Sequence, residues 1–204
     1  MAEIRLIDVA DPPEVWLQLG FAVEDGGCRV GTTAVRLGAA GDGVTGWELT
    51  GAPGLDELPL AAGAPAAPAG DGPEHPNGVV SLDHVVVTAP DLDHTIDAFE
   101  QAGVPLRRIR DIGTPDRPAV QAFFKMGDVV VEVVGSPGRP GPGSARFYGL
   151  AFTVADLDAT ARLLGDRLGP AKPAVQPGRR IATLDRRAGS TVPIAFMSPA
   201  PSRS

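Results

Sequence analysis

A run of apolar residues in the middle of the chain predicts a strand followed by a helix. Residues 85–88 are apolar or β-branched, which favours a buried strand, and Pro90 ends the run. The next apolar residues recur at the spacing of one helix face: Leu92, Ile96, Phe99 and Ala102. Asp91 or Asp93 is placed to cap the start of this helix, and Gly103 is placed to end it.

A second run of the same kind points to a duplication. Residues 150–154 favour a strand, and Asp156 stands at the start of the next helix. Gly165 or Gly169 ends that helix. Three further strands are expected after each helix, at 106–111, 119–126, 129–134, 174–176, 179–184 and 191–197. Residues 81–199 are therefore expected to form two β-α-β-β-β modules, a repeat of one structural unit.

The N-terminal part of the chain predicts a smaller unit with the same order of elements. A strand is expected at 4–9, a helix from the prolines at 12 and 13 to Gly20, and strands at 21–23, 28–37 and 44–50. Residues 1–53 should thus be a β-α-β-β-β-like half-module. Its open sheet face should pack on the rest of its own chain, or on the half-module of a second subunit in a homodimer.

The remaining segments and the overall composition complete the expected α+β architecture. Residues 54–80 are rich in Gly, Ala and Pro, which is typical of a linker, and residues 200–204 form a tail. Cys28 is the only cysteine, so no intrachain disulfide can form and a reducing, cytoplasmic location is expected. The N-terminus lacks a signal-peptide pattern, and no apolar run approaches about 20 residues, so no membrane partner is expected.

The charge of the chain argues against nucleic-acid binding. Eighteen basic and 25 acidic side chains leave a net charge of −7. No basic face then remains to displace counterions from a phosphate backbone. No nucleic-acid partner is therefore expected.

The first module carries a pattern that resembles a known superfamily. It opens on His84-Val85-Val86-Val87, continues with Asp91-Leu92, and closes on Val131-Glu132-Val133-Val134. With a second module behind it, this pattern resembles the vicinal oxygen chelate superfamily, which includes glyoxalase I, methylmalonyl-CoA epimerase, extradiol dioxygenases and bleomycin-resistance proteins. The resemblance implies that the two modules form a half-open barrel around one ligand cleft. It also implies that the first and last strands of each module hold any catalytic metal.

The resemblance assigns two metal positions and leaves two without ligands. His84 and Glu132 match the positions in the first module, and a histidine with a carboxylate suits a divalent cation. Gly149 and Ile194 stand at the corresponding positions of the second module, so no metal is predicted to be required. A divalent metal remains an option if the N-terminal unit faces the first module, because Glu48 would then join His84 and Glu132. Without a metal, Glu132 is expected to pair with an arginine or an organic ligand, and it is the catalytic candidate if the protein is an enzyme.

Strand alternation selects the other cleft residues. Gln121, Phe123 and Lys125 share one face of their strand. A turn brings Arg179 and Arg180 to the start of another strand, where one of them could hold a carboxylate. The expected ligand contacts are His84, Gln121, Phe123, Phe147, Phe152 and Arg180. This mixture favours a partly apolar small molecule with a carboxylate or carbonyl group.

Three functions are compatible with these observations. The first is a glyoxalase-like small-molecule-binding protein without the complete metal site. The second is a metal-dependent lyase, isomerase or dioxygenase acting on a small carbonyl or enediol-type substrate that the metal polarises. The third is a non-catalytic scaffold whose cleft is filled by side chains. Fold resemblance alone does not choose among them.

Overall fold

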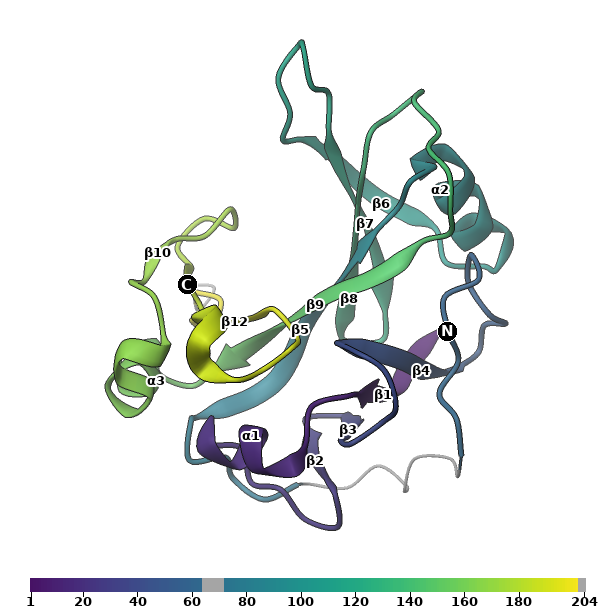
Figure 1. Ribbon diagram of the computed structural model, residues 1–204. Helices are drawn as coiled ribbons and strands as arrows, with labels where there is room; N and C mark the ends of the chain where they lie inside the picture. The colour runs from purple at the N-terminus through teal and green to yellow at the C-terminus, as the bar shows by residue number, and fades with distance from the viewer. Residues whose placement is uncertain (64–71, 202–204) are drawn as a thin grey trace.

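The computed structural model describes residues 1–63 and 72–201, which form two β-sheets and three α-helices (Figure 1). The stretches 64–71 and 202–204, which belong to the expected linker and tail, lie outside the described residues. None of the helices in the described part has the length and apolarity needed to cross a membrane.

An eight-stranded sheet carries the two modules side by side. Its strands and their helices are β5 (Val79–Thr88), α2 (Leu92–Gln101), β6 (Leu106–Asp111), β7 (Val120–Met126), β8 (Val129–Gly135), β9 (Arg146–Val154), α3 (Leu157–Leu164), β10 (Lys172–Pro173), β11 (Arg180–Thr183) and β12 (Ile194–Met197). In space the strands follow the order β10-β11-β12-β9-β5-β8-β7-β6. The expected α+β fold with two β-α-β-β-β modules is confirmed, as an open sheet.

An approximate two-fold axis relates the two modules and passes between Val85 and Leu150. β5 and β9 are antiparallel and place Val85 opposite Leu150. β8 lies parallel to β5, and β12 lies parallel to β9, so each module has the same pairing of first and last strands. Val85 and Leu150 also correspond to each other in the repeat, and His84 therefore corresponds to Gly149, as the sequence predicts.

Each module helix begins at an aspartate, as the sequence predicts. Asp91 accepts a hydrogen bond from the backbone N–H of His94 (3.1 Å), and Asp156 accepts one from the backbone N–H of Ala159 (3.1 Å). These carboxylates satisfy backbone donors that have no partner within the helix. Gly165 ends α3 with a φ of 58°, a conformation that favours glycine.

The N-terminal unit has the expected order of elements but its own strand order. It consists of β1 (Glu3–Val9), α1 (Pro13–Gln18), β2 (Gly27–Val30), β3 (Thr33–Arg36) and β4 (Val44–Thr50). The sheet order is β2-β3-β1-β4, with β1 parallel to β3 and antiparallel to β4, whereas in the modules the first and last strands are parallel. Residues 21–23 form no strand, because Phe21 turns into the core against Trp16 (ring centroids 4.5 Å apart). The expected strand at 28–37 is instead a hairpin that turns at Gly31, whose φ is 57°.

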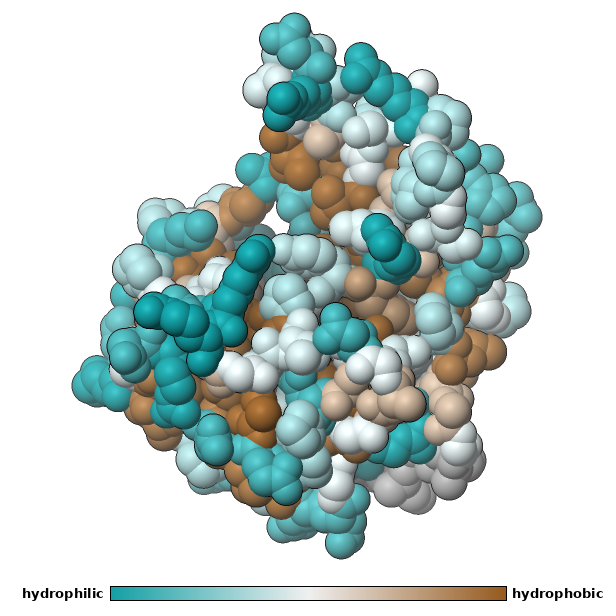
Figure 2. Space-filling view, viewed as in Figure 1, coloured by the Kyte–Doolittle hydropathy of each residue, from teal (hydrophilic) through white to brown (hydrophobic). Residues whose placement is uncertain are grey.

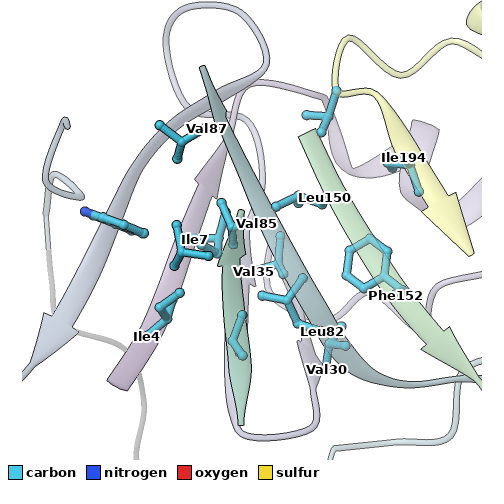
Figure 3. Close-up of a cluster of buried hydrophobic side chains, with 14 of the residues drawn as sticks. Ile4, Ile7, Val30, Val35, Leu82, Val85, Val87, Leu150, Phe152 and Ile194 are labelled. Atoms are coloured by element: carbon cyan, nitrogen blue, oxygen red, sulfur yellow. The ribbon is translucent and has the colours of Figure 1, made fainter. Parts of the chain in front are cut away.

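The N-terminal unit packs on the modules of its own chain. Trp16 and Phe21 contact Phe152 of β9, with ring centroids 5.9 and 5.3 Å apart. Figure 3 shows Ile7 of β1 lying beside Val85 of β5, so that the two sheets face each other across shared side chains. Buried residues of both sheets belong to one hydrophobic core.

Asp11 fastens the N-terminal unit to the loop before β12. Its carboxylate is fully buried and accepts hydrogen bonds from Trp16 Nε1 (3.1 Å), Ser190 Oγ (2.6 Å) and the backbone N–H of Thr191 (2.7 Å). These donors satisfy a carboxylate that would otherwise be costly to bury.

The eight-stranded sheet has one covered face and one open face. A row of paired residues on the covered face is at most 2% exposed: Phe124, Val131, Val85, Leu150 and Ile194. Phe99 of α2 packs on Phe124 (ring centroids 4.5 Å apart), and the N-terminal unit covers the centre. We call this the outer face. The inner face lies on the opposite side, between the two arms of the sheet, where Figure 2 shows the molecule hollowed.

Candidate functional site

Two rows of paired residues cross the inner face. The first row is Lys125, Val130, His84, Ala151, Ala195 and Thr183. The second row is Arg108, Phe123, Glu132, Val86 and Gly149. Gln121 lies on the same face, two positions before Phe123 on β7. The structure thus brings His84, Glu132, Gln121 and Phe123 together on the face that the sequence assigns to the cleft.

A β-bulge places Asp83 beside His84. The pairing of β5 with β9 shifts register between Leu82 and His84. Leu82 is buried on the outer face at 3% exposure, and the extra residue lets Asp83 and His84 both reach the inner side. Nδ1 of His84 lies 2.9 Å from Oδ2 of Asp83. The bulge therefore supplies His84 with a carboxylate partner that strict alternation would place on the other face.

Glu132 lies between His84 and Gln121 on the inner face. Its Oε1 accepts a hydrogen bond from Nε2 of Gln121 (2.6 Å), and its Oε2 lies 4.0 Å from Nε2 of His84. The side chains of His84 and Glu132 are only 16% and 15% exposed. Arg110 donates in turn to Oε1 of Gln121 (3.1 Å), so that the polar chain continues onto β6. This chain holds the glutamate in one orientation.

Arg179 fixes Asp83 from the second module. Nη1 of Arg179 lies 2.7 Å from Oδ1 of Asp83, and Nη2 donates to Oγ1 of Thr153 (3.0 Å). Nε donates to the carbonyl of Ser198 (2.8 Å), and Nη1 also donates to Oε1 of Gln176 (2.5 Å). The arginine side chain is 8% exposed. A single guanidinium group thus joins β5, β9, the end of β12 and the turn before β11.

The electrostatic surroundings keep Asp83 ionised. Burial alone would raise the pKa of Asp83, but hydrogen bonds from His84 and Arg179 and the charge of Arg179 together lower the pKa to about 2. The carboxylate is therefore an acceptor, and the hydrogen between it and His84 belongs to Nδ1 of the imidazole. Nε2 of the same ring faces Glu132.

Three of the expected ligand contacts lie elsewhere. Phe152 packs against Trp16 on the outer face, and Phe147 packs against Trp47 with ring centroids 5.0 Å apart. Both aromatic rings are taken up by the N-terminal unit, which the sequence did not place on this face. Arg180 lies at the protein surface and forms two hydrogen bonds with Asp158 of α3 (3.0 and 2.8 Å).

The metal positions of the second module hold no ligand groups. In the second module, Ala195 and not Ile194 corresponds to Glu132. Glu132 lies opposite Val86, and Ala195 lies opposite Ala151, the residue that corresponds to Val86 in the repeat. Ile194 corresponds to Val131 and points to the outer face. At Gly149, a Cβ atom would lie 2.5 Å from the carbonyl oxygen of Pro193. Any side chain there would require the backbone to move.

The described residues do not fit a divalent metal centre. Two donors, His84 and Glu132, remain from the four positions, and the third nearby donor, Asp83, is held by Arg179. Glu48 lies in β4 of the separate four-stranded sheet and does not join them, because the second module and not the N-terminal unit pairs with the first. Within residues 1–63 and 72–201, no group of three or more His, Cys, Asp or Glu side chains could hold a metal ion.

Comparison with sequence families identifies the modules. Residues 83–183 match the family model of the Glyoxalase/Bleomycin resistance protein/Dioxygenase superfamily. These residues belong to that superfamily. The match runs from the bulge in β5 to the end of β11, and it confirms the resemblance to the vicinal oxygen chelate superfamily. The N-terminal unit lies outside the matched region.

Solved structures resemble part of the chain. Methylmalonyl-CoA epimerase from Mycobacterium tuberculosis is 24% identical, with a TM-score of 0.48, and the alignment covers 61% of this chain and 91% of that protein. A variant of the Streptomyces coelicolor methylmalonyl-CoA epimerase in complex with 2-nitronate-propionyl-CoA is 20% identical, with a TM-score of 0.47. That alignment covers 62% of this chain and 99% of the epimerase. No curated protein sequence matches the chain.

Sequence reasoning missed two residues that organise the inner face. Asp83 directly precedes His84, and alternation assigns it to the opposite face, so only the bulge reveals its role. Arg179 was weighed together with Arg180, and the signal that separates them is their position relative to β11. Arg180 begins the strand with its side chain on the outer side, which leaves Arg179 to point inward.

Proposed function

We propose that the inner face of the eight-stranded sheet binds a small, partly apolar organic molecule without the four-ligand metal centre of the superfamily. One observation carries the proposal. The carbonyl oxygen of Pro193 closes position 149 to any side chain, and position 195 is an alanine, so the second module offers no metal ligands opposite His84 and Glu132. The first module nevertheless keeps an ordered set of polar groups.

The composition of the inner face supports binding of an organic molecule. Val86, Val130 and Phe123 supply apolar surface, and they are neither fully buried nor fully exposed. Among them, His84, Gln121 and Glu132 are held in place by hydrogen bonds. Sites for small molecules combine an apolar wall with a few oriented polar groups in this way.

The alternatives receive less support from the described residues. A metal-dependent lyase, isomerase or dioxygenase needs more donors than His84 and Glu132 provide. The argument for a carboxylate- or carbonyl-bearing ligand rested on Arg179 or Arg180. Arg180 lies on the outer side with Asp158, and Arg179 points inward but is held by Asp83. The argument for a homodimer rested on an open N-terminal unit, and that unit packs on its own chain.

A binding screen with the metal-free protein tests the proposal. The full chain is treated with a chelator and titrated with a set of carboxylates, ketones, alcohols and amines, while the melting temperature and methyl NMR signals are recorded. We expect at least one compound to shift the signals of Val86 and Val130. At a concentration of about one hundred times its Kd, it should stabilise the protein by about 2.7 kcal/mol.

Two variants separate the inner face from other binding surfaces. Val86→Phe fills the inner face and should abolish binding, whereas Arg180→Ala changes only the outer surface and should leave the affinity unchanged. Binding that requires a divalent ion, or binding that Arg180→Ala weakens and Val86→Phe does not, would contradict the proposal. Failure of every compound class would favour the scaffold.

A further inference from the structure

The carboxylate of Glu132 has no lysine or arginine partner among the described residues, and His84 can form an ion pair with it only when protonated. Its side chain is 15% exposed, and among the described residues no lysine or arginine nitrogen lies within 4.0 Å of it. Its direct hydrogen bond comes from the neutral amide of Gln121. Burial of a carboxylate is costly unless a cation or several donors compensate the charge. The charge of Glu132 is therefore available to a ligand.

Lys125 and Arg108 also lie on the inner face; Arg108 lies over the ring of Phe123, and within the described residues neither forms an ion pair with Glu132. Two further arginines are engaged with other partners. Arg179 forms its ion pair with Asp83, and Arg110 reaches only the side-chain oxygen of Gln121. On the β9 side, His84 and Val86 lie opposite Ala151 and Gly149, which carry no charge. The inner face around Glu132 thus contains a negative charge that none of these side chains neutralises directly.

The neutral form of His84 presents a second acceptor to the same space. When Nδ1 carries the hydrogen shared with Asp83 and the ring has no second hydrogen, Nε2 carries a lone pair. Nε2 lies 4.0 Å from Oε2 of Glu132. A single nitrogen atom can lie about 2.8 Å from both acceptors and donate one hydrogen to each. A hydroxyl group, with only one hydrogen, cannot satisfy both.

We propose that His84 and Glu132 bind the primary ammonium group of an organic cation whose apolar part lies on Val86 and Val130. The inference rests on the proposed function and names the chemical class of its ligand. An ammonium group needs only a few hydrogen-bond acceptors, so two residues suffice where a divalent metal requires more. The same two side chains that cannot complete a metal centre thus fit a primary ammonium group.

A matched series of ligands tests this assignment. Hexylammonium, hexyltrimethylammonium and hexan-1-ol share one apolar chain and differ in charge and in N–H donors. They are titrated into the chelator-treated full chain, and binding is followed by the ring signals of His84 and the methyl signals of Val86. Charge-assisted hydrogen bonds should make hexylammonium bind about tenfold or more tightly than either of the other two compounds.

Variants locate the effect at the two acceptors. Glu132→Gln keeps the size of the side chain and removes its charge, and it should weaken hexylammonium binding about tenfold while leaving hexan-1-ol unchanged. His84→Asn should weaken hexylammonium in the same direction. Asp158→Asn removes a carboxylate from the outer surface and should change neither affinity. Melting temperatures of all variants verify that they fold.

Several results would overturn the inference and still leave the proposed function standing. These are equal affinity for hexylammonium and hexyltrimethylammonium, or no effect of Glu132→Gln. If a neutral or anionic compound binds the inner face while hexylammonium does not, the ligand class is wrong and the binding site is right. If no compound of any class reaches the inner face, both fail.

Discussion

Trp16 of α1 meets Phe152 of β9 edge to face, with ring centroids 5.9 Å apart and ring planes at 88°. Both side chains are fully buried. This contact joins the N-terminal unit to the centre of the eight-stranded sheet, on the side opposite the candidate site. The sheet of this unit covers the outer face, and the inner face remains open.

Trp16→Ala should therefore destabilise the whole chain. Loss of a large buried aromatic side chain costs about 3–5 kcal/mol in the free energy of unfolding. The same α1 offers a control in Leu17, which is 52% exposed, so that Leu17→Ala should have a much smaller effect. Urea unfolding followed by circular dichroism measures both. A separate early transition of the N-terminal unit, with the modules unaffected, would show that the two sheets do not share one core.

Gly149→Ala should destabilise the protein because the added Cβ meets the carbonyl oxygen of Pro193 at 2.5 Å. Overpacking of this kind costs about 1–3 kcal/mol in the free energy of unfolding. Gly54→Ala is the matched control, since nothing lies within 4 Å of a Cβ at Gly54. If urea unfolding gives both variants the stability of the parent, position 149 has room for a side chain and the steric argument against a metal ligand there is lost.

Arg179→Met should lower the free energy of unfolding, because it breaks the buried ion pair on the inner face. The variant leaves the carboxylate of Asp83, with a side chain 12% exposed, without its cation, and breaking such a pair costs about 3–5 kcal/mol. Asp83→Asn in the same chain should recover part of this loss, because it removes the unpaired charge. Arg180→Met changes the adjacent arginine, which is solvated with Asp158, and should alter stability little. Equal melting temperatures for Arg179→Met and Arg180→Met would contradict this role.

The stability of the chain should fall as the pH is lowered through 6.5, because of His75. Its Nδ1 accepts a hydrogen bond from the backbone N–H of Ala22 (3.0 Å), and its Nε2 donates to the carbonyl of Arg29 (2.9 Å). Burial lowers the pKa of His75, and the bond to Arg29 opposes this shift only in part. The unfolded chain therefore binds a proton at a higher pH than the folded chain, which makes the free energy of unfolding decrease with falling pH.

Urea unfolding at pH 7.5, 6.5 and 5.5 measures the contribution of His75. His75→Gln should lose stability and also lose this part of the pH dependence. A parent chain with constant stability over this range, or an unchanged slope in His75→Gln, would show that His75 is not held neutral by the fold.

Local patterns predicted the modules well because each element carries its own signals. Asp91 and Asp156 start helices, and apolar alternation fixes which side of β7 and β8 faces the core, so Gln121, Phe123 and Glu132 were placed on the right face. These signals depend on neighbours in the chain. They do not require knowledge of what packs against the sheet.

The wrong assignments depended on contacts between distant segments. Phe147 and Phe152 were expected in the cleft, but both contact the N-terminal unit. The alternation of residues along β9 does not show which face of the strand this unit covers. A bulge brings Asp83 to the inner face, and strand pairing shows that Ala195, the neighbour of Ile194, corresponds to Glu132. Neither the bulge nor the pairing can be read from the sequence of one strand. A shift of one residue in a strand exchanges its two faces.

The dependence of ligand affinity on divalent ions tests the central claim most directly. The affinity of the full chain for a compound that binds the inner face, starting with hexylammonium, is measured by calorimetry in chelator and again with Mg²⁺, Mn²⁺ or Zn²⁺ added. We predict the same Kd under all conditions, and the loss of binding in Val86→Phe. Binding that appears only when a divalent ion is present, together with stoichiometric metal that is lost in His84→Ala, would contradict the account.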